Sequence, residues 1–372
     1  MLPTMARMFR TGADSVSARL RQRLHEAIAA AGGWLPFDRW MATALYEPAL
    51  GYYARDARQF GALPSSGSDF VTAPELSPLF GAALARQIAQ ALDATGTDEL
   101  FEFGAGSGAL AGQLLQALGS RVRHYSIVDL SGALRARQAE RLAPFGERVR
   151  WLHAWPGRME GVVVGNEVLD AMPVQLLHFD GLHWHERGVV TSGDGFAWQE
   201  RPTTLRPPHD GPFAPGTVTE IHAQAEAFVH TLAGRLARGA AFFVDYGFPE
   251  AEYYHPQRSG GTLMCHRGHR ADADPLADPG DKDITAHVNF SAIALAGQDA
   301  GLRVLGYTSQ AHFLFNCGIA ELLATASVAE RAAAQKLLAE HEMGELFKVI
   351  GFVAGEPFDA IGFAHGDRSH RL

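Results

Sequence analysis

The chain contains few cysteines, no long apolar segment and no excess of basic residues. Its 372 residues include two cysteines, which excludes a disulfide-stabilised framework and is typical of a reducing compartment. No apolar run approaches the ~20 residues that a membrane-spanning helix requires, so we expect no membrane insertion. The formal net charge of −9 does not favour nucleic acid as a partner, because phosphates require a basic surface. What remains is a globular protein, long enough for one large domain or two smaller ones.

Motifs for hydrolysis and for metal binding are also lacking. No G-x-S-x-G nucleophile motif occurs in the chain. Cys265, His266 and His269 lie close together, but no second pair of ligands follows at the spacing of a tetrahedral zinc site. We therefore expect neither a serine hydrolase nor a metal centre.

A glycine-rich loop follows a short apolar strand that is predicted at residues 100–103. The loop reads G-A-G-S-G from Gly104 to Gly108, and an amphipathic helix begins directly after it. Glycine tolerates the backbone angles of a tight turn and lets a ligand approach the main chain, while free N–H groups at the helix start face that ligand. Asp129 ends the next predicted strand, roughly 20 residues after the loop, where a carboxylate commonly binds a ribose. The pattern predicts a cofactor that contains a nucleoside.

Predicted strands and helices alternate through the middle of the chain. Continuous apolar strands between helices indicate a parallel sheet covered on both faces. The order fits a seven-stranded sheet with a final antiparallel strand, and the lack of a second β-α-β-α-β half disfavours an NAD fold. Two of the helices are expected over 75–92 and 219–236. The seven strands are predicted at residues 100–103, 125–129, 149–153, 162–164, 241–245, 302–307 and 347–353.

The remaining segments divide the chain into a cap, a core domain and a tail. Residues 1–97 are predicted to form a helical cap with a long loop, 54–74, whose aromatic and apolar residues favour an ordered lid. Residues 98–360 form the sheet domain, and the tail at 361–372 is expected to be disordered. Two insertions interrupt the sheet domain, an antiparallel β segment at 174–216 and a polar segment at 248–289.

A polar segment, N-E-V-L-D, follows the fourth predicted strand at residues 166–170. Ligands of open parallel sheets bind outside the carboxyl ends of the strands, and this segment lies at the switch point of the predicted sheet. Glu167 and Asp170 offer two carboxylates, which suit the planar fork of donors on a guanidinium. The structural alternative is a helix start with Asn166 as the N-cap, and the two interpretations are compatible. Residues 245–246, at the end of the next strand, are either turn residues or part of the same site.

Eight stretches of the chain resemble the MidA-like methyltransferase family, from about residue 36 to residue 353. The mitochondrial members of this family are complex I assembly factors that methylate arginine. The resemblance implies a class I methyltransferase, that is, a Rossmann-like α/β fold with a seven-stranded sheet, an N-terminal helical cap and an inserted antiparallel β segment. The matching stretches are ALYEPALGYY (44–53), SDFVTAPELSPLFG (68–81), EFGAGSGAL (102–110), NEVLDAMPV (166–174), VDYG (244–247), GTLMCHRGHR (261–270), DITAHVNF (283–290) and MGELFKV (343–349).

The resemblance also implies a cofactor and roles for residues. The cofactor is S-adenosyl-L-methionine, held by the glycine loop, with Asp129 on the ribose and the T-A-P-E segment (72–75) covering the site. Asn166, Glu167 and Asp170 are the expected catalytic residues, the two acids orienting a guanidinium and one of them accepting a proton. The expected cofactor-binding residues are Glu102, Gly104, Ala105, Gly106, Ser107, Gly108, Asp129, Asn166, Thr72, Pro74 and Glu75.

The implied function is methyl transfer to an arginine of a protein substrate, with a respiratory-complex subunit among the candidates. Three alternatives stay open: a different protein or small-molecule acceptor, an assembly factor that binds the cofactor with little catalysis, and an NAD-binding protein, which the strand order disfavours. The first 23 residues hold five arginines and one acid, as in a mitochondrial transit peptide or, our preferred interpretation, a surface helix. We therefore expect a cytoplasmic protein, with mitochondria as the alternative. The sequence leaves the oligomeric state and the acceptor open.

Overall fold

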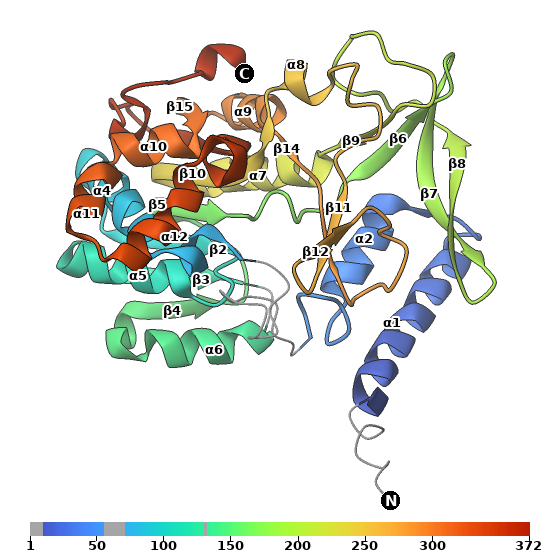
Figure 1. Ribbon diagram of the computed structural model, residues 1–372, viewed down its shortest axis with the longest axis horizontal. Coiled ribbons are helices and arrows are strands. Elements are labelled where there is room, and N and C mark those ends of the chain that lie inside the picture. Colours follow the sequence, from blue (N-terminus) through green and yellow to red (C-terminus); the bar gives the residue numbers. More distant parts are fainter. Residues whose placement is uncertain (1–9, 56–70, 130–131) are drawn as a thin grey trace, which may run out of the picture.

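The computed structural model describes residues 10–55, 71–129 and 132–372 (Figure 1). Most of the loop that is predicted to be a lid, including Asp69, lies outside these residues, as do the first residues of the arginine-rich start. Figure 1 shows a larger α/β lobe beside a smaller lobe that contains the N-terminal helices. None of the helices in the described residues is both long enough and apolar enough to cross a membrane.

The central sheet contains the strands β2 (Glu99–Phe103), β3 (His124–Val128), β4 (Val149–Leu152), β5 (Met159–Asn166), β10 (Leu236–Phe248), β15 (Arg303–Ser309) and β16 (Phe347–Ala354). They lie in the order β4-β3-β2-β5-β10-β16-β15, and the short β14 (Val288–Asn289) pairs with the end of β10. The strands from β4 to β10 are parallel to their neighbours, whereas β16 is antiparallel to both β10 and β15. The predicted class I arrangement, a seven-stranded sheet with a final antiparallel strand, is confirmed.

Helices cover both faces of this sheet. One face carries α4 (Pro78–Thr95), α5 (Ala109–Leu118), α6 (Gly132–Leu142), α10 (Gln310–Asn316), α11 (Ile319–Thr325) and α12 (Val328–Leu338), and the other carries α7 (Ala223–Arg235) and α9 (Phe290–Asp299). Val162, Val164 and Phe242 pack into the first core, and Val163 and Phe243 into the second. Successive side chains of a strand point to opposite faces, so a strand buried on both sides is apolar throughout.

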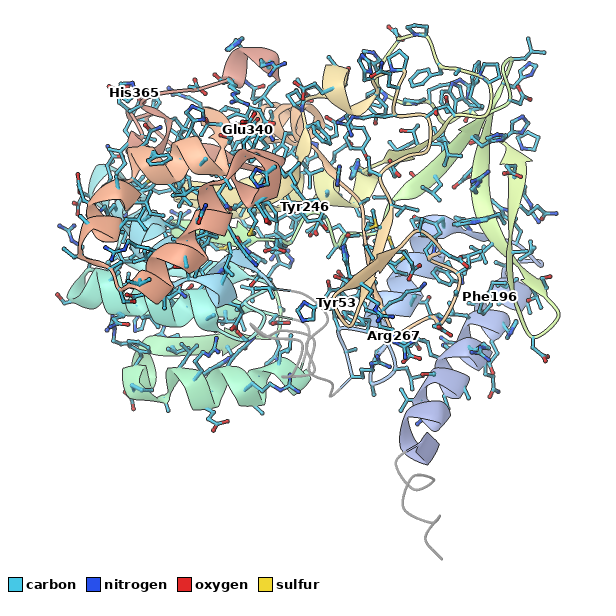
Figure 2. All side chains as sticks on the ribbon, viewed as in Figure 1. Tyr53, Phe196, Tyr246, Arg267, Glu340 and His365 are labelled. Carbon is cyan, nitrogen blue, oxygen red and sulfur yellow. The ribbon has the colours of Figure 1, made fainter. Side chains whose placement is uncertain are left out.

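The smaller lobe combines the N-terminal helices with the first insertion. It contains α1 (Arg10–Ala30), β1 (Leu35–Pro36), α2 (Phe37–Tyr46), β6 (Gln175–Phe179), β7 (Trp184–Ser192), β8 (Gly195–Pro202) and β9 (Val218–Ile221). The strands are ordered β1-β7-β6-β9, with β8 paired to β7. Leu24, Trp40 and Val189 share the core between these helices and strands. Figure 2 shows Tyr53 and Tyr246 where the two lobes face each other.

The second insertion has regular structure of its own. It contains α8 (Glu250–Tyr253) and a small sheet of β11 (Met264–Arg267), β12 (Arg270–Asp272) and β13 (Asp283–Thr285), in the order β12-β11-β13. Cys265 and Ile284 are fully buried in the core of the smaller lobe. The insertion is therefore held against the N-terminal helices.

Two expected helices have different bounds in the structure. The helix expected over 219–236 begins at Ala223, because residues 218–221 pair with β6 as strand β9. The helix expected over 75–92 is divided into α3 (Ala73–Leu76) and α4, with extended backbone at Ser77, whose side chain caps α4. Strand pairing sets the start of α7, and the cap at Ser77 sets the start of α4. The helical periodicity of the sequence predicts neither boundary.

The prediction of a disordered tail at 361–372 is wrong. The segment contains two short 3-10 turns, Ile361–Phe363 and Ser369–Arg371. Phe363 is buried in the first core, and Asp367 accepts a hydrogen bond from the N–H of Tyr307 at 2.9 Å. A buried ring and a backbone anchor therefore order this segment.

Candidate active site

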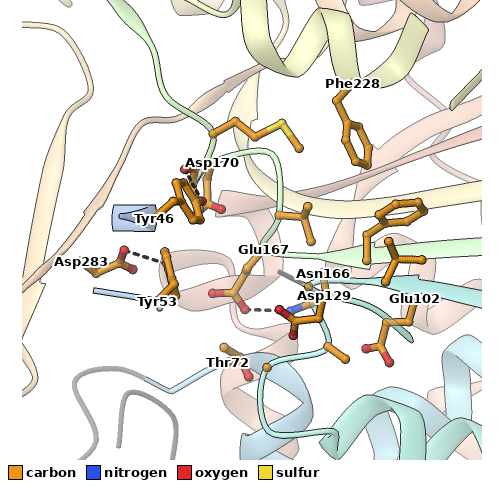
Figure 3. Close-up of a pocket in the computed structure, with 18 of the residues that line it drawn as sticks. Tyr46, Tyr53, Thr72, Glu102, Asp129, Asn166, Glu167, Asp170, Phe228 and Asp283 are labelled. Atoms are coloured by element: carbon orange, nitrogen blue, oxygen red, sulfur yellow. Dashed lines mark hydrogen bonds between the residues drawn. The ribbon is translucent and has the colours of Figure 1, made fainter. Parts of the chain in front are cut away.

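A cavity of about 980 Å³ lies at the carboxyl ends of the parallel strands (Figure 3). Its wall includes Phe103, the last residue of β2, Asp129, directly after β3, Asn166, the last residue of β5, and Tyr246 on β10. Residues of the cap, such as Tyr46, and of the second insertion, such as His266, also line it. Ligands of open parallel sheets bind at this position.

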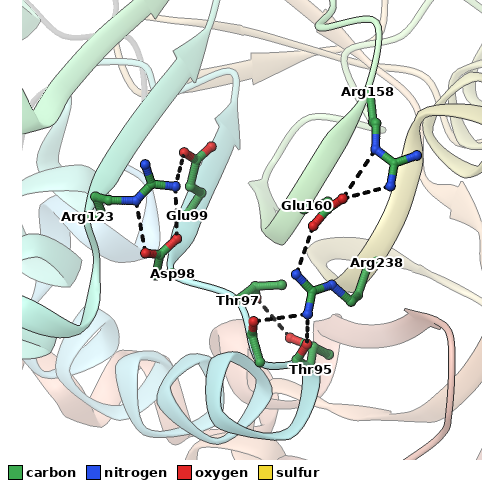
Figure 4. Close-up of polar contacts among 9 residues, drawn as sticks. Thr95, Thr97, Asp98, Glu99, Arg123, Arg158, Glu160 and Arg238 are labelled. Atoms are coloured by element: carbon green, nitrogen blue, oxygen red, sulfur yellow. Dashed lines mark hydrogen bonds and ion pairs between the residues drawn. The ribbon is translucent and has the colours of Figure 1, made fainter.

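The opposite edge of the sheet carries a group of paired charges (Figure 4). Arg123 pairs with Asp98 at 2.9 Å, and Glu160 pairs with Arg158 at 2.7 Å and with Arg238 at 2.8 Å. The charges balance one another within the group, and pairs as exposed as these contribute little to stability. The cavity at the carboxyl edge is therefore the candidate site.

Three glycines shape the loop after β2. Gly104, Gly106 and Gly108 have φ values of +65°, +52° and +80°, which glycine adopts without strain. A Cβ on Gly104 would lie 3.0 Å from the side chain of Val168, so the loop packs closely against the segment after β5. Gly104, Ala105, Gly106 and Ser107 line the cavity, whereas Gly108 is the N-cap of α5 and lies outside the lining. A ligand can approach the main chain of this loop closely.

Asp129 lines the cavity and is held by Gln138 of α6, a residue absent from the predicted site. The amide of Gln138 donates to Asp129 Oδ2 at 3.0 Å and to the carbonyl of Gly106 at 2.9 Å. Its oxygen accepts the indole N–H of Trp151 at 3.0 Å, and the side chain is fully buried. Gln138 thus fixes Asp129 relative to the glycine loop. No local pattern distinguishes this glutamine from the other polar residues of α6, because its partners belong to other segments.

Glu102 lies beneath the loop on β2 and is 2% exposed. Burial raises the pKa of this carboxyl to about 8, although the hydroxyl of Tyr125, which donates to Oε2 at 2.7 Å, lowers it. The nearby charge of Asp129 raises it further. A cation bound in the cavity would therefore favour the ionised form of Glu102.

The residues of the T-A-P-E segment are placed differently from one another. Thr72 and Pro74 line the cavity. Glu75 lies outside the lining, where it accepts a hydrogen bond from Ser107 and another, at 2.8 Å, from Arg141. Glu75 therefore ties α3 to the glycine loop, and its position gives no support to the expected direct contact with the cofactor.

Residues 166–170 form a turn rather than the start of a helix. Glu167 has a φ of +55°, a left-handed conformation that costs energy outside glycine and occurs at functional sites. The buried carboxylate of Asp245 accepts the N–H groups of residues 168–170 at 3.1, 2.9 and 3.3 Å. The helix-start interpretation of Asn166 is therefore wrong. Of the residue pair at the end of the next strand, Asp245 caps this turn and Tyr246 lines the cavity.

Glu167 and Asp170 both line the cavity, where Asp170 is buried and Glu167 is half-buried. Burial and the charge of Asp170 raise the pKa of Glu167 to about 8, opposed by hydrogen bonds from Asn166, at 3.0 Å, and the backbone of Ala73. Burial raises the pKa of Asp170 to about 6, opposed by a hydrogen bond from Tyr246. Among the described residues that line the cavity there is no lysine or arginine, but there are five acids. They are Glu102, Asp129, Glu167, Asp170 and Asp283. A cavity of this composition favours a cationic ligand.

Aromatic residues that include Tyr46, Tyr53 and His287, all three absent from the predicted site, line the same cavity. Tyr46 donates to the carbonyl of Ala171 at 2.8 Å, and its ring stacks on Tyr53 with centroids 5.5 Å apart. The rings of Tyr246 and His287 meet edge to face, with centroids 5.2 Å apart. All four lie in stretches that carry the family resemblance, which is the signal that could have found them. Aromatic residues in such stretches are equally expected in the hydrophobic core, so the resemblance alone does not assign them to the cavity.

The cysteine–histidine cluster of the second insertion is divided between two environments. Cys265 is buried in the core of the smaller lobe, whereas His266 lines the cavity. In the part of the chain that the structure describes, no group of three or more His, Cys, Asp or Glu side chains could hold a metal ion.

Solved structures of similar proteins share this architecture. A crystal structure of a protein from Burkholderia thailandensis bound to S-adenosyl-homocysteine superposes with a TM-score of 0.93 at 52% identity, covering 100% of both chains. A native crystal structure from the same organism superposes with a TM-score of 0.89 at 51% identity, also covering 100% of both chains. The open glycine loop, the carboxylate after β3 and the buried Glu102 fit the same kind of cofactor.

Sequence comparisons point to the same family. The curated mitochondrial protein arginine methyltransferase NDUFAF7 of Danio rerio is 28% identical over 350 residues, 82% of this chain and 78% of that protein. Its Caenorhabditis elegans homologue is 27% identical over 328 residues, 77% of this chain and 74% of that protein. Residues 83–308 match the family model described as "Putative S-adenosyl-L-methionine-dependent methyltransferase". The chain therefore belongs to this MidA-like family of class I methyltransferases, and its cofactor is S-adenosyl-L-methionine.

Proposed function

We propose that the protein methylates arginine side chains of a protein substrate. The observation that carries the proposal is the composition of the cavity, whose described lining residues include five acids and no lysine or arginine. A guanidinium has five N–H donors in one plane and keeps its positive charge at physiological pH. The names of the curated relatives, which are arginine methyltransferases, support the same acceptor.

The cofactor end of the proposed site is formed by the strand ends of β2 and β3. The loop at 104–107 offers its main chain, Asp129 binds the ribose, and Asn166 lies next to Glu167, between the cofactor and the acceptor. When bound, S-adenosyl-L-methionine supplies a methyl group that is activated by a positively charged sulfur. Thr72 and Pro74 cover the cavity, which keeps water away from the reacting atoms.

The acceptor end depends on Glu167 and Asp170. Asn166 and the left-handed backbone hold the carboxylate of Glu167 in one position, where it orients the guanidinium. A guanidinium nitrogen that gains a methyl group must release one proton. The pKa values of Glu167 and Asp170, about 8 and about 6, suit either residue to accept that proton near neutral pH.

The experiment that tests this function is methyl labelling of a cell lysate. The purified protein is incubated with lysate and S-adenosyl-L-methionine that carries an isotopic label in its methyl group, and the labelled residue is identified by mass spectrometry. We expect the label on arginine. Labelling that occurs on another residue type, with none on arginine, would contradict the proposal.

An assembly factor that binds the cofactor with little catalysis is the alternative. The two insertions favour it, because they add strands to the surface beyond the central sheet. This alternative predicts binding of S-adenosyl-L-methionine without labelled product in any lysate.

The compartment and the partner belong to the same proposal. The curated relatives are named as mitochondrial proteins, so the mitochondrial alternative fits them, and the cytoplasmic default of the sequence finds no support there. Within mitochondria, a respiratory-complex subunit is the candidate substrate.

A further inference from the structure

The second insertion contributes one carboxylate to the cavity. Asp283 is the first residue of β13, is 3% exposed and lines the cavity. Its Oδ1 accepts hydrogen bonds from the hydroxyl of Tyr53 at 2.7 Å and from the N–H of Ile284 at 2.9 Å. Tyr53 lies in the cap, seven residues after Tyr46, the last residue of α2. The pair of Tyr53 and Asp283 therefore joins the cap to the insertion at the wall of the cavity.

Asp283 lies on the acceptor side of this cavity. Figure 3 shows Asp283 and Tyr53 on the side of Glu167 that faces away from Asp129 and Glu102. Burial and then the charge of Asp283 are the two largest causes that raise the pKa of Tyr53. Burial and the charge of Asp170 raise the pKa of Glu167, and the charge of Asp283 raises it further. The carboxylates of Asp283 and Glu167 line the same cavity, so both face a common space.

Tyrosine rings border the same space. The ring of Tyr46 stacks on that of Tyr53, and burial, Asp283 and Asp170 all raise the pKa of Tyr46. These hydroxyls are therefore neutral at physiological pH, and the rings offer faces that attract a cation. A planar cation would find rings beside its faces and carboxylates around its edges.

We propose that Asp283, held by Tyr53, is a specificity-determining residue that binds the cationic group of the methyl acceptor. The proposal rests on the proposed function and deepens it, because Glu167 and Asp170 contact one edge of the guanidinium and Asp283 contacts another. Five donors around one plane can serve carboxylates on two sides. A neutral acceptor would make weaker hydrogen bonds to these carboxylates than a cation does. The second insertion, and not the sheet edge alone, thus selects the acceptor.

A neighbouring pair joins the same two segments outside the cavity. Arg55 pairs with Asp281 at 2.6 Å, and Ser17 donates to Asp281 at 3.0 Å. Asp281 is not among the described residues that line the cavity. The variant Asp281→Asn therefore weakens the contact between cap and insertion without removing charge from the acceptor space, which makes it a matched control.

The test titrates ethylguanidinium into the full-length protein saturated with S-adenosyl-homocysteine and follows the heat of binding. Hydrogen bonds to charged groups contribute more to binding affinity than neutral ones do. We therefore expect Asp283→Asn to bind ethylguanidinium about tenfold more weakly than wild type, and Tyr53→Phe about threefold more weakly. We expect Asp281→Asn to remain within about twofold of wild type. The affinity for S-adenosyl-homocysteine is expected to stay within about twofold in all three variants, because the cofactor end is unchanged.

Several results would overturn the proposal. They are a wild-type protein that does not bind ethylguanidinium, an unchanged affinity in Asp283→Asn, and an equal loss in Asp281→Asn, which would assign the effect to the contact between segments. If Asp283→Asn does not fold, the test is the affinity of Tyr53→Phe for ethylguanidinium. An affinity equal to that of wild type would then overturn the proposal.

The lysate assay separates this inference from the proposed function. Label on arginine with undiminished transfer by Asp283→Asn removes Asp283 from the acceptor site and leaves the arginine function standing. Label on a different residue type, with transfer reduced in Asp283→Asn and intact in Asp281→Asn, removes arginine and keeps Asp283 as an acceptor-binding residue.

Discussion

Glu167 combines a strained backbone with a half-buried carboxyl group in one residue. Its φ of +55° is maintained because the N–H groups of the next three residues are bound by Asp245. Its carboxylate is held by Asn166 at 3.0 Å within a cavity that contains further acids. Strain of this kind persists where surrounding contacts enforce it, and it fixes the direction of a reacting side chain.

Glu167→Gln tests this role, because glutamine keeps the shape but loses the charge and the proton-accepting group. We expect kcat/KM for methyl transfer to fall by about a hundredfold or more, as for the loss of a general base. The affinity for S-adenosyl-homocysteine should change by less than about threefold, since Glu167 lies on the acceptor side. Undiminished transfer in this variant, measured with the same lysate, would remove Glu167 from the mechanism.

Gln138→Ala tests the other end of the site. Asp129 and the carbonyl of Gly106 would each lose a donor, so we expect S-adenosyl-homocysteine to bind about tenfold more weakly by titration calorimetry. The exposed Gln116 of α5 provides the control variant Gln116→Ala, which should bind like wild type. Equal affinities in the two variants would show that Gln138 does not position Asp129.

The raised pKa of Glu102 predicts how the stability of the protein without cofactor depends on pH. Its folded pKa of about 8 lies above its ordinary value of 4.5, so the folded state binds the proton more tightly. The contribution of this proton to the free energy of unfolding is complete below about pH 4.5 and is lost as pH rises through about 8. The Tm of Glu102→Gln should therefore fall less than that of wild type between about pH 5 and pH 8. Parallel curves of Tm against pH for wild type and Glu102→Gln would contradict the raised pKa of Glu102. The control variant is Glu356→Gln, at an exposed site.

The sequence predicted those site residues whose chemistry is carried by contiguous segments at strand ends. Glycine at alternate positions and an acid after the next strand are local patterns, and Gly104 and Asp129 both line the cavity. Gln138, Tyr53 and Asp283 could not be found in this way. Their roles depend on partners in other segments, which only the folded chain brings into contact.

At the scale of elements, the turn after β5 depends on a neighbouring strand for its conformation. Asp245 on β10 caps three consecutive N–H groups, so strand pairing between β5 and β10 positions this turn. Asp245→Ala leaves these donors buried without a partner, and we expect a loss of about 2–4 kcal/mol in the free energy of unfolding, measured in urea. Asp245→Asn keeps an accepting oxygen and should lose less than half of that. Equal losses in the two variants would show that capping is not the cause.

The order of strands was more predictable than the ends of elements. Apolar runs such as 162–164 are long enough to identify buried strands, and their alternation with helices restricts the topology. The boundary at 218–221 depends on pairing with β6, the break at Ser77 on capping, and the ordered tail on the burial of Phe363. Each of these is a tertiary interaction, which a local pattern does not contain.

At the scale of the whole molecule, the cap and the first insertion form one unit. Leu24 of the cap and Val189 of the insertion belong to a single core, and Cys265 of the second insertion joins it. The acceptor space lies where this unit meets the carboxyl edge of the central sheet. The sheet supplies Glu167 and Asp170, and the smaller lobe supplies Tyr53 and Asp283. This arrangement predicts that the sheet edge binds the cofactor and that the junction of the lobes selects the acceptor.

The central claim is that the charge of this cavity selects a cationic acceptor. The most direct measurement compares ethylguanidinium with ethylurea, a neutral analogue of similar shape, by titration into the protein saturated with S-adenosyl-homocysteine. The account predicts that ethylguanidinium binds at least about tenfold more tightly than ethylurea, and that Glu167→Gln reduces this preference. Equal binding of the two compounds, or a preference for ethylurea, would contradict it.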